Sequence, residues 1–169
     1  MSTLALDRLY ILTTGQNNAE ALIAATLHIF APAGIFLSAP YSESAFSLLN
    51  FVGYCLYVYG SKRRALGRDA SVVASGLCFA AATIVRSNGI LNGILFATDL
   101  LALGPLGLLQ DIRYGASLVL AGTLTAFGSA WPQYKAYQEY CTSTGAQAPR
   151  PWCTALVPSV YTFVQEHYW

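Results

Sequence analysis

The sequence predicts an all-α, polytopic membrane helix bundle with about five transmembrane helices. Of the 169 residues, 55% are hydrophobic and only 10% are charged, with a net charge of +1, whereas soluble domains carry about 25% charged residues. The mean hydropathy is +0.47. The apolar residues gather in long runs separated by short polar links. This composition excludes a secreted disulfide scaffold, a nucleic-acid binder with a basic face and a disordered chain.

Five apolar runs have the length of transmembrane helices. Each has between 16 and 20 residues, close to the roughly 20 that a helix needs to cross the hydrocarbon core. Backbone groups find no water in lipid, so we expect every run to be helical. No polar face alternates with the apolar residues, as it would in a soluble bundle. The predicted spans are 21–37, 45–60, 70–85, 90–109 and 114–131.

The basic residues predict which side of the membrane each link faces. The strongest basic cluster lies between the second and third runs and consists of Lys62, Arg63, Arg64 and Arg68. The positive-inside rule places this link in the cytosol. Alternation then places the links 38–44 and 86–89 on the opposite side. Residues 1–131 form the multi-span region, and residues 132–169 follow on the far side.

Small residues and prolines predict how the helices pack. The pairs Gly89/Gly93 and Gly76/Ala80 have the small-x-x-x-small spacing that lets helix backbones approach closely. Pro105 lies inside the fourth run and predicts a kink.

Two further features concern the first and fourth runs. Pro32 predicts a kink in the first run. A repeated tetrapeptide begins at Asn88 and again at Asn92, which predicts both asparagines on one helical face.

Asp99 is the polar residue that conflicts most with the membrane pattern. It lies in the middle of the fourth run, where a charged side chain costs about 2.5–3.5 kcal/mol on insertion scales. We therefore expect it to be protonated, paired or facing a wet cavity. Arg86 is about 20 Å away along a helix and cannot be its partner. His28, midway along the first run, is the expected partner; a hydrogen bond to a neighbouring helix is the alternative.

The cysteines and the known motifs add little chemistry. Cys141 and Cys153 both lie in residues 132–169, and the sequence leaves open whether they form a disulfide. The sequence contains no C-x-x-C, H-E-x-x-H, P-loop or G-x-G-x-x-G motif. It therefore gives no support to a metal site or a nucleotide site.

Three segments on the predicted far side carry a family resemblance. They are 32–44 (PAGIFLSAPYSES), 85–89 (VRSNG) and 150–153 (RPWC), the last leading into 161–169 (YTFVQEHYW). In this order they resemble the GPI mannosyltransferase 2 family of the PIG-V type, and most closely its fungal members.

The resemblance implies a multi-pass enzyme of the endoplasmic reticulum membrane, part of a GT-C type glycosyltransferase. Such an enzyme adds the second mannose of the GPI anchor, in α-1,6 linkage, from dolichyl-phosphate mannose to a GPI precursor lipid. It acts on the lumenal side, which makes 132–169 a lumenal segment. The resemblance implies no cofactor besides this donor. The implied partners are the two lipid substrates, membrane lipids and a small membrane subunit, and no nucleic acid.

The reaction suggests roles for several residues. Inversion at a β-linked donor needs a carboxylate base and a group that stabilises the departing phosphate. Arg86 suits the phosphate, with interfacial snorkelling as its alternative role. Glu43 suits sugar hydroxyls, with capping of a helix start as its alternative. The other substrate-binding candidates, for which helix packing or interfacial anchoring is the alternative, are Tyr41, Asn88, Asn92, His167, Tyr168 and Trp169.

The chain also departs from the family pattern. GT-C enzymes of this kind carry an acidic catalytic motif in their first lumenal loop, and we expect that motif to lie before Met1. We therefore expect an internal piece of a longer protein, without a catalytic base or activity of its own. Two other classes stay open. A non-catalytic membrane subunit needs only packing faces, and a transporter-like bundle needs Asp99, His28 and Arg86 along one wet pathway.

Overall fold

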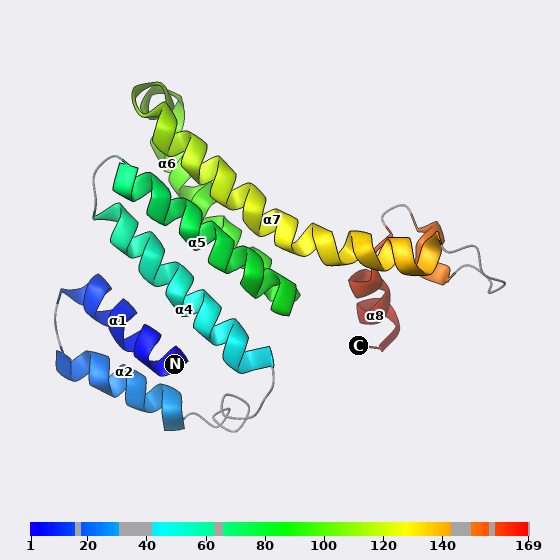
Figure 1. Cartoon of the computed structure of the whole chain (residues 1–169), viewed down its shortest axis with the longest axis horizontal. Coiled ribbons are helices and arrows are strands. Elements are labelled where there is room, and N and C mark those ends of the chain that lie inside the picture. The colour runs from blue at the N-terminus through cyan, green and yellow to red at the C-terminus, as the bar shows by residue number, and fades with distance from the viewer. Residues whose placement is uncertain (16–17, 31–41, 63–65, 143–149, 156–157, 169) are drawn as a thin grey trace. The chain divides into compact units, whose positions relative to one another are not determined.

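The computed structural model describes residues 1–15, 18–30, 42–62, 66–142, 150–155 and 158–168. In these ranges every regular element is a helix, which confirms the all-α prediction (Figure 1). The elements are α1 (Ser2–Thr14), α2 (Asn18–Phe30), α4 (Ser42–Ser61), α5 (Leu66–Val85), the 3-10 helix η1 (Ser87–Asn92), α6 (Gly93–Gln110), α7 (Ile112–Cys141), the 3-10 helix η2 (Pro151–Thr154) and α8 (Val160–Tyr168).

The chain divides into two compact units, Met1–Gly128 (unit 1) and Ser129–Trp169 (unit 2). In unit 1, α4 and α5 lie side by side as antiparallel neighbours, α1 packs along α4, and α2 packs along α1 (Figure 1). The buried core lies between α5, α6 and α7 and consists of Val72, Phe79, Phe96, Leu118 and Ala121.

Small residues set the distance between α5 and α7, as the Gly76/Ala80 spacing predicted. A methyl group at Gly76 would lie 2.6 Å from the Ala121 Cα atom. One turn further along α5, the main chain of Ala80 lies against Gly128 of α7. Of the Gly89/Gly93 pair, only Gly89 is at a close approach, where a methyl group would lie 2.7 Å from the Thr83 nitrogen. Backbone contact without intervening side chains therefore holds α5 against α7.

Two of the predicted spans are long and apolar enough to cross a membrane. They are Leu66–Val85 and Ser87–Gln110, which contain the predicted spans 70–85 and 90–109. The predicted span 45–60 lies in α4, and α2 is a shorter apolar helix of 13 residues. Residues 31–37 of the first predicted span lie outside the described residues.

The predicted end at residue 131 is not the end of a helix, because α7 continues through Pro132 to Cys141. The apolar run stops at Trp131 and gives way to Gln133 and Lys135. Polarity marks the end of an apolar surface, but Gln and Lys are good helix formers.

Backbone conformation confirms one local prediction and overturns another. Gly104 has φ +62° immediately before Pro105 and breaks the regularity of α6. This break confirms the kink, since proline disfavours helical geometry in the residue before it. Asn88 and Asn92 do not share a helical face, because they belong to a 3-10 helix with about three residues per turn. Asn88 is exposed, whereas Asn92 is 8% exposed. Pro32 lies outside the described residues.

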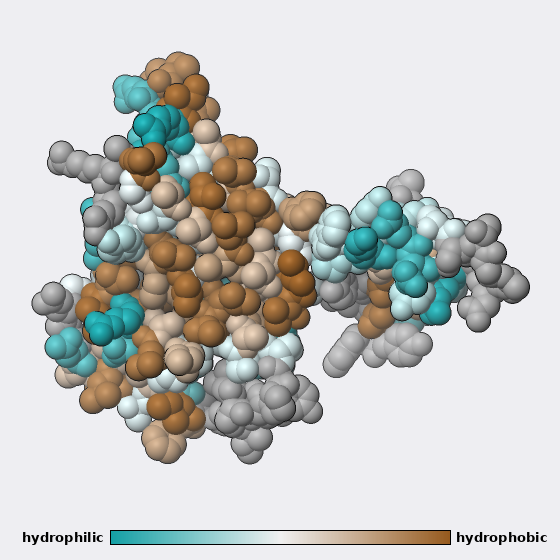
Figure 2. Space-filling view, in the orientation of Figure 1, coloured by the Kyte–Doolittle hydropathy of each residue, from teal (hydrophilic) through white to brown (hydrophobic). Residues whose placement is uncertain are grey.

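Unit 1 carries large apolar side chains on its surface. Leu27 and Phe30 of α2 are 67% and 79% exposed, and Leu101 and Leu109 of α6 are 81% and 79% exposed. Figure 2 shows hydrophobic residues over most of the visible face of unit 1. Exposed apolar area of this extent is typical of a surface that faces lipid or another protein.

We predict that Gly76→Ala lowers the stability of the chain by about 1–3 kcal/mol, because the added methyl group forces α5 and α7 apart. The measurement is the denaturation midpoint of the detergent-solubilised chain. Gly93→Ala is the matched control, since its methyl group would meet its nearest neighbour, Thr125 Cγ2, at 3.9 Å. A Gly76→Ala variant as stable as the control would contradict the close-packing account.

Candidate functional site

Two polar clusters lie between the helices of unit 1. The Arg86 cluster consists of the ion pair of Arg86 with Glu43 and of a separate hydrogen-bonded group, Asn50, Tyr54 and Asn92, which follows it along α4. The Asp99 cluster consists of Tyr57, Arg68, Asp69, Asp99, Asp111, Arg113 and Tyr114. Helix α4 contributes to both clusters through residues spaced by three, four or seven positions, which lie along one helical face.

Arg86 and Glu43 form an ion pair across two helices. Arg86 lies between α5 and η1 and has an extended backbone, with φ −145° and ψ 128°. Its side chain therefore does not point in the direction that a helical residue at this position would give it. Its Nη1 atom donates to Glu43 Oε1, in the first turn of α4, at 3.0 Å. The two side chains are 42% and 31% exposed. The structure therefore brings together two candidates that are 43 residues apart in the sequence.

The second carboxylate oxygen of Glu43 makes no hydrogen bond within the described part of the chain. Glu43 Oε2 is buried and has no hydrogen-bond partner among the residues that the structure describes. An unsatisfied buried oxygen is unfavourable, and in native proteins such atoms are rare and often mark a ligand or a chemical role. Glu43 thus combines one oxygen that holds Arg86 with one that is free to accept a hydrogen bond.

Asn92 links helices in the structure. Its Nδ2 atom donates to Asn50 Oδ1 at 2.5 Å, and its Oδ1 atom accepts from the Tyr54 hydroxyl at 2.7 Å. Asn50 in turn donates to the Phe46 carbonyl at 3.0 Å. These contacts favour the packing role that the sequence left as an alternative for Asn92. The exposed Asn88 lies outside this network.

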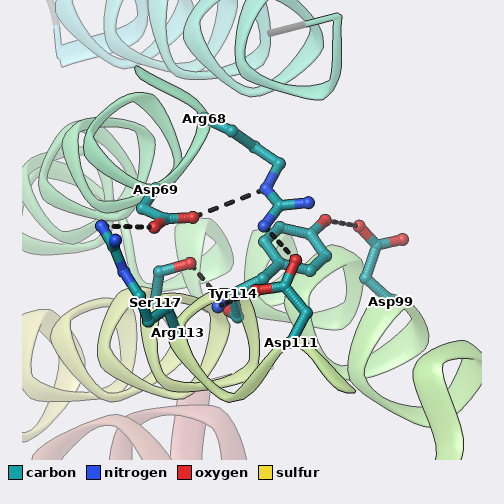
Figure 3. A network of polar contacts seen from close by, with 7 residues as sticks. All are labelled: Arg68, Asp69, Asp99, Asp111, Arg113, Tyr114 and Ser117. Carbon is teal, nitrogen blue, oxygen red and sulfur yellow. Dashed lines mark hydrogen bonds and ion pairs between the residues drawn. The ribbon is translucent and has the colours of Figure 1, made fainter. Parts of the chain in front are cut away.

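The Asp99 cluster ties four helices together, and Figure 3 shows the part of it that joins α5, α6 and α7. Asp99 of α6 accepts hydrogen bonds from the hydroxyls of Tyr57 on α4 and Tyr114 on α7, the latter at 2.9 Å. The Arg68 guanidinium of α5 lies 4.0 Å from the centre of the Tyr114 ring and pairs with Asp111.

A third carboxylate extends this cluster at the start of α5. Asp69 pairs with Arg68 at 3.5 Å and with Arg113 of α7 at 3.3 Å. The charged groups at the starts of α5 and α7 therefore neutralise one another.

Of the two readings of Asp99, the hydrogen bond to a neighbouring helix is confirmed and the pairing with His28 is wrong. Asp99 is satisfied by two phenol donors, whereas His28 lies on α2 with its Nε2 atom 3.5 Å from Ser2 Oγ and its ring 5.4 Å from that of Phe51. The charge pattern of the sequence does not identify tyrosine as a partner, although its phenol donates well to a carboxylate. The signal in the sequence was the presence of tyrosines inside apolar runs.

Aromatic packing separates the two clusters. Phe79 and Phe96 are 0% and 2% exposed, and their ring centres lie 5.8 Å apart. Tyr54 packs on Phe79 and Tyr57 packs on Phe96. Within the described residues, this filled core gives no support to a wet pathway that would join Asp99 to Arg86.

The candidates near the C-terminus belong to unit 2. A disulfide joins Cys141 of α7 to Cys153 of η2, with Cα atoms 5.7 Å apart. His167 stacks on Phe163 at 4.2 Å, and its Nδ1 atom lies 3.0 Å from the Phe163 carbonyl oxygen, so it is engaged within α8. The side chain of Tyr168, together with Tyr41 and Trp169, lies outside the described residues. In the described ranges, no group of three or more His, Cys, Asp and Glu side chains is arranged to hold a metal ion.

Two helices long and apolar enough to cross a membrane, together with exposed apolar side chains, are typical of a membrane protein. The profile of the mannosyltransferase (PIG-V) family matches residues 2–169, and the chain belongs to this family. This match confirms the resemblance seen in the sequence.

Several curated proteins are similar to the chain. It is 44% identical to a GPI mannosyltransferase 2 of Aspergillus fumigatus, over 99% of this chain and 41% of that protein. It is 43% identical to one of Chaetomium globosum, over 88% and 36%. It is 35% identical to a GPI alpha-1,6-mannosyltransferase 2 of Cricetulus griseus, over 89% and 34%. The chain thus spans well under half the length of these relatives. No solved structure matches it.

Asp111 gives a pH-dependent prediction. The Arg68 guanidinium, with the Tyr114 backbone N–H, holds the pKa of the Asp111 carboxyl below its ordinary value of 3.8. Because the folded pKa is lower than the unfolded one, the ionised carboxyl stabilises the fold above pH 3.8, and this contribution is lost as the pH falls through the folded value.

We therefore predict that wild type is more stable than Asp111→Asn near neutral pH and that the difference shrinks in acid. The measurement is the melting temperature of both chains from about pH 7 to about pH 2. Arg68→Met removes the largest cause of the shift, while the Tyr114 backbone N–H remains, and should reduce the same difference. Parallel curves for wild type and Asp111→Asn would contradict the assignment.

Proposed function

We propose that the chain forms part of an enzyme that adds the second mannose, in α-1,6 linkage, from dolichyl-phosphate mannose to a GPI precursor. Its family and the names of its relatives support this activity. The structural observation that carries the proposal is the ion pair between Arg86 and Glu43, which lies inside the matched region and leaves one carboxylate oxygen free.

The pair offers complementary chemistry for a sugar phosphate. Arg86 is partly exposed, and its remaining N–H groups can bind the departing lipid phosphate through a planar fork of donors. Glu43 Oε1 fixes the guanidinium, while Oε2 can accept a hydrogen bond from a sugar hydroxyl. Hydrogen bonds to charged groups contribute about 1.5–3 kcal/mol each. The proposal assigns no catalytic base within this chain.

We further propose a GT-C type arrangement in the endoplasmic reticulum membrane. Residues 1–131 supply the multi-span region with five spans, and residues 132–169 lie in the lumen. The exposed apolar side chains of unit 1 support the membrane location, and the basic residues of 62–68 support the orientation. Tyr41, Asn88 and Trp169 are proposed as further substrate-binding residues, as the family resemblance implies.

The topology predicts that a glycosylation sequon introduced around Gly145 is modified, whereas one introduced around Leu66 is not. The reason is that basic links stay in the cytosol, where the glycosylation machinery cannot reach them. The measurement is the mobility shift of each variant with and without glycosidase treatment. Modification at 66 but not at 145 would reverse the proposed orientation.

The activity predicts that the chain can replace the matching part of a relative. In a chimaera, residues 2–169 replace the matched segment of the Aspergillus fumigatus GPI mannosyltransferase 2. Expressed in cells that lack their own enzyme, the chimaera should restore GPI-anchored proteins at the cell surface. Within it, Arg86→Ala should lower transfer by about 100-fold or more, since a donor to the leaving phosphate is lost. A stable chimaera without activity would contradict the proposal.

An exchange variant separates binding from packing. Glu43→Arg combined with Arg86→Glu restores an ion pair between α4 and the end of α5 but moves the guanidinium to the other helix. If Arg86 binds phosphate, the exchange variant accumulates normally and stays inactive. Recovery of activity by the exchange would show that the pair serves only to hold the helices together.

A further inference from the structure

Unit 2 contains a cavity to which the proposed function gives no role. Its volume is about 360 Å³, within the range of about 300–1,000 Å³ that is usual for small-molecule sites. It is lined by Pro132, Gln133, Ala136, Tyr140, Arg150, Trp152 and Val160. These residues come from α7, from the start of η2 and from the start of α8.

The walls of this cavity are fixed by specific contacts. The disulfide between Cys141 and Cys153 ties the end of α7 to η2. Gln133 of α7 accepts a hydrogen bond from the Val160 N–H at 3.3 Å and donates to Ser159 Oγ at 3.2 Å, which holds the start of α8. The cavity is therefore formed by three elements that are linked to one another.

Arg150 supplies the charge of the cavity. Among the described residues that line the cavity, it is the one with a charged side chain. Its guanidinium carbon lies 4.8 Å from the centre of the Tyr140 ring. The side chain is exposed, and no carboxylate pairs with it within the described part of the chain. Stacking on an aromatic face leaves the N–H groups at the edge of a guanidinium free to bind an anion.

The other residues that line the cavity are apolar or already make contacts within unit 2. Trp152 is 6% exposed and forms a wall together with Pro132, Ala136 and Val160. Both amide atoms of Gln133 are used to hold α8. A cation would be repelled by Arg150, whereas an anionic group would gain charge-assisted hydrogen bonds from its guanidinium. The lining fits a single anionic group attached to a ring that has an apolar face.

We propose that this cavity binds the inositol phosphodiester headgroup of the acceptor lipid, with the phosphate on Arg150 and the ring against Trp152. This inference rests on the proposed function, in which the enzyme holds two phosphodiester lipids at the same time. Arg86 of unit 1 is assigned to the phosphate of the donor. We assign the acceptor phosphate to a second guanidinium, that of Arg150 in unit 2.

The test measures binding by the purified full chain in detergent micelles, using calorimetry. The probes are glycerophosphoinositol, which represents the acceptor headgroup, and a short-chain polyprenyl mannosyl phosphate, which represents the donor. Glycerophosphoinositol should bind more tightly than the donor probe at this site. Arg150→Met should weaken its binding about tenfold or more, because charged hydrogen bonds are lost. Arg150→Lys, which keeps the charge without the fork, should fall between the two.

Lys135→Met is the matched control. Lys135 belongs to the same unit and lies 5.2 Å from the Trp131 ring centre, but it does not line the cavity. Its variant loses the same charge and should bind glycerophosphoinositol as wild type does. Equal losses in Arg150→Met and Lys135→Met, unchanged binding in Arg150→Met, or tighter binding of the donor probe would each overturn the proposal.

Folding of unit 2 is checked by counting thiols under denaturing, non-reducing conditions. An intact disulfide leaves only Cys55 and Cys78 reactive. If Arg150→Met loses the disulfide, Arg150→Lys decides the question by the same criterion. Because binding is measured without turnover, its failure overturns this inference alone, whereas an inactive chimaera that still binds the probe overturns the proposed function.

Discussion

The carboxylate of Asp99 is the constraint on which the rest of unit 1 depends. It lies inside an apolar bundle, where an unsatisfied polar group costs about 1–3 kcal/mol and a charged one more. Two tyrosines from different helices satisfy it, and Arg68 covers the ring of Tyr114. One carboxylate therefore fixes α4, α6 and α7 against one another, and the contact of Arg68 with Tyr114 adds α5 to this group. Sliding any of these helices along its neighbours would leave the carboxylate without a donor.

The same constraint sets the position of the candidate site. On α4, Asn50 and Tyr57 are two turns apart, and their partners Asn92 and Asp99 are also two turns apart along η1 and α6. Matched spacing on both sides permits a single register, since a slip by one residue would break both contacts. Arg86 precedes Asn92, the first of these partners, in the chain, and Glu43 likewise precedes Asn50 on α4. The same register therefore brings Arg86 to Glu43 at the start of α4.

Local chemistry explains which features could be predicted. Composition and apolar runs predict the helices, and Pro105 predicts the break at Gly104, because both follow from neighbours in the sequence. A hydrogen bond from a neighbouring helix was an open reading for Asp99, but the sequence did not identify Tyr57 and Tyr114 as the donors, since neutral phenols on distant helices leave no charge pattern to follow. The ion pair of Arg86 with Glu43 was missed for a similar reason: each residue was a candidate, but only the fold brings them together.

The redox state of the disulfide in unit 2 reports which compartment this part of the chain has reached. Cysteine pairs form and persist in oxidising compartments and are reduced in the cytosol. The bridge between Cys141 and Cys153 is therefore expected only in molecules whose C-terminal segment has met an oxidant. Its presence or absence in a population of chains would distinguish correctly delivered molecules from those left in a reducing environment, independently of whether either kind turns over substrate.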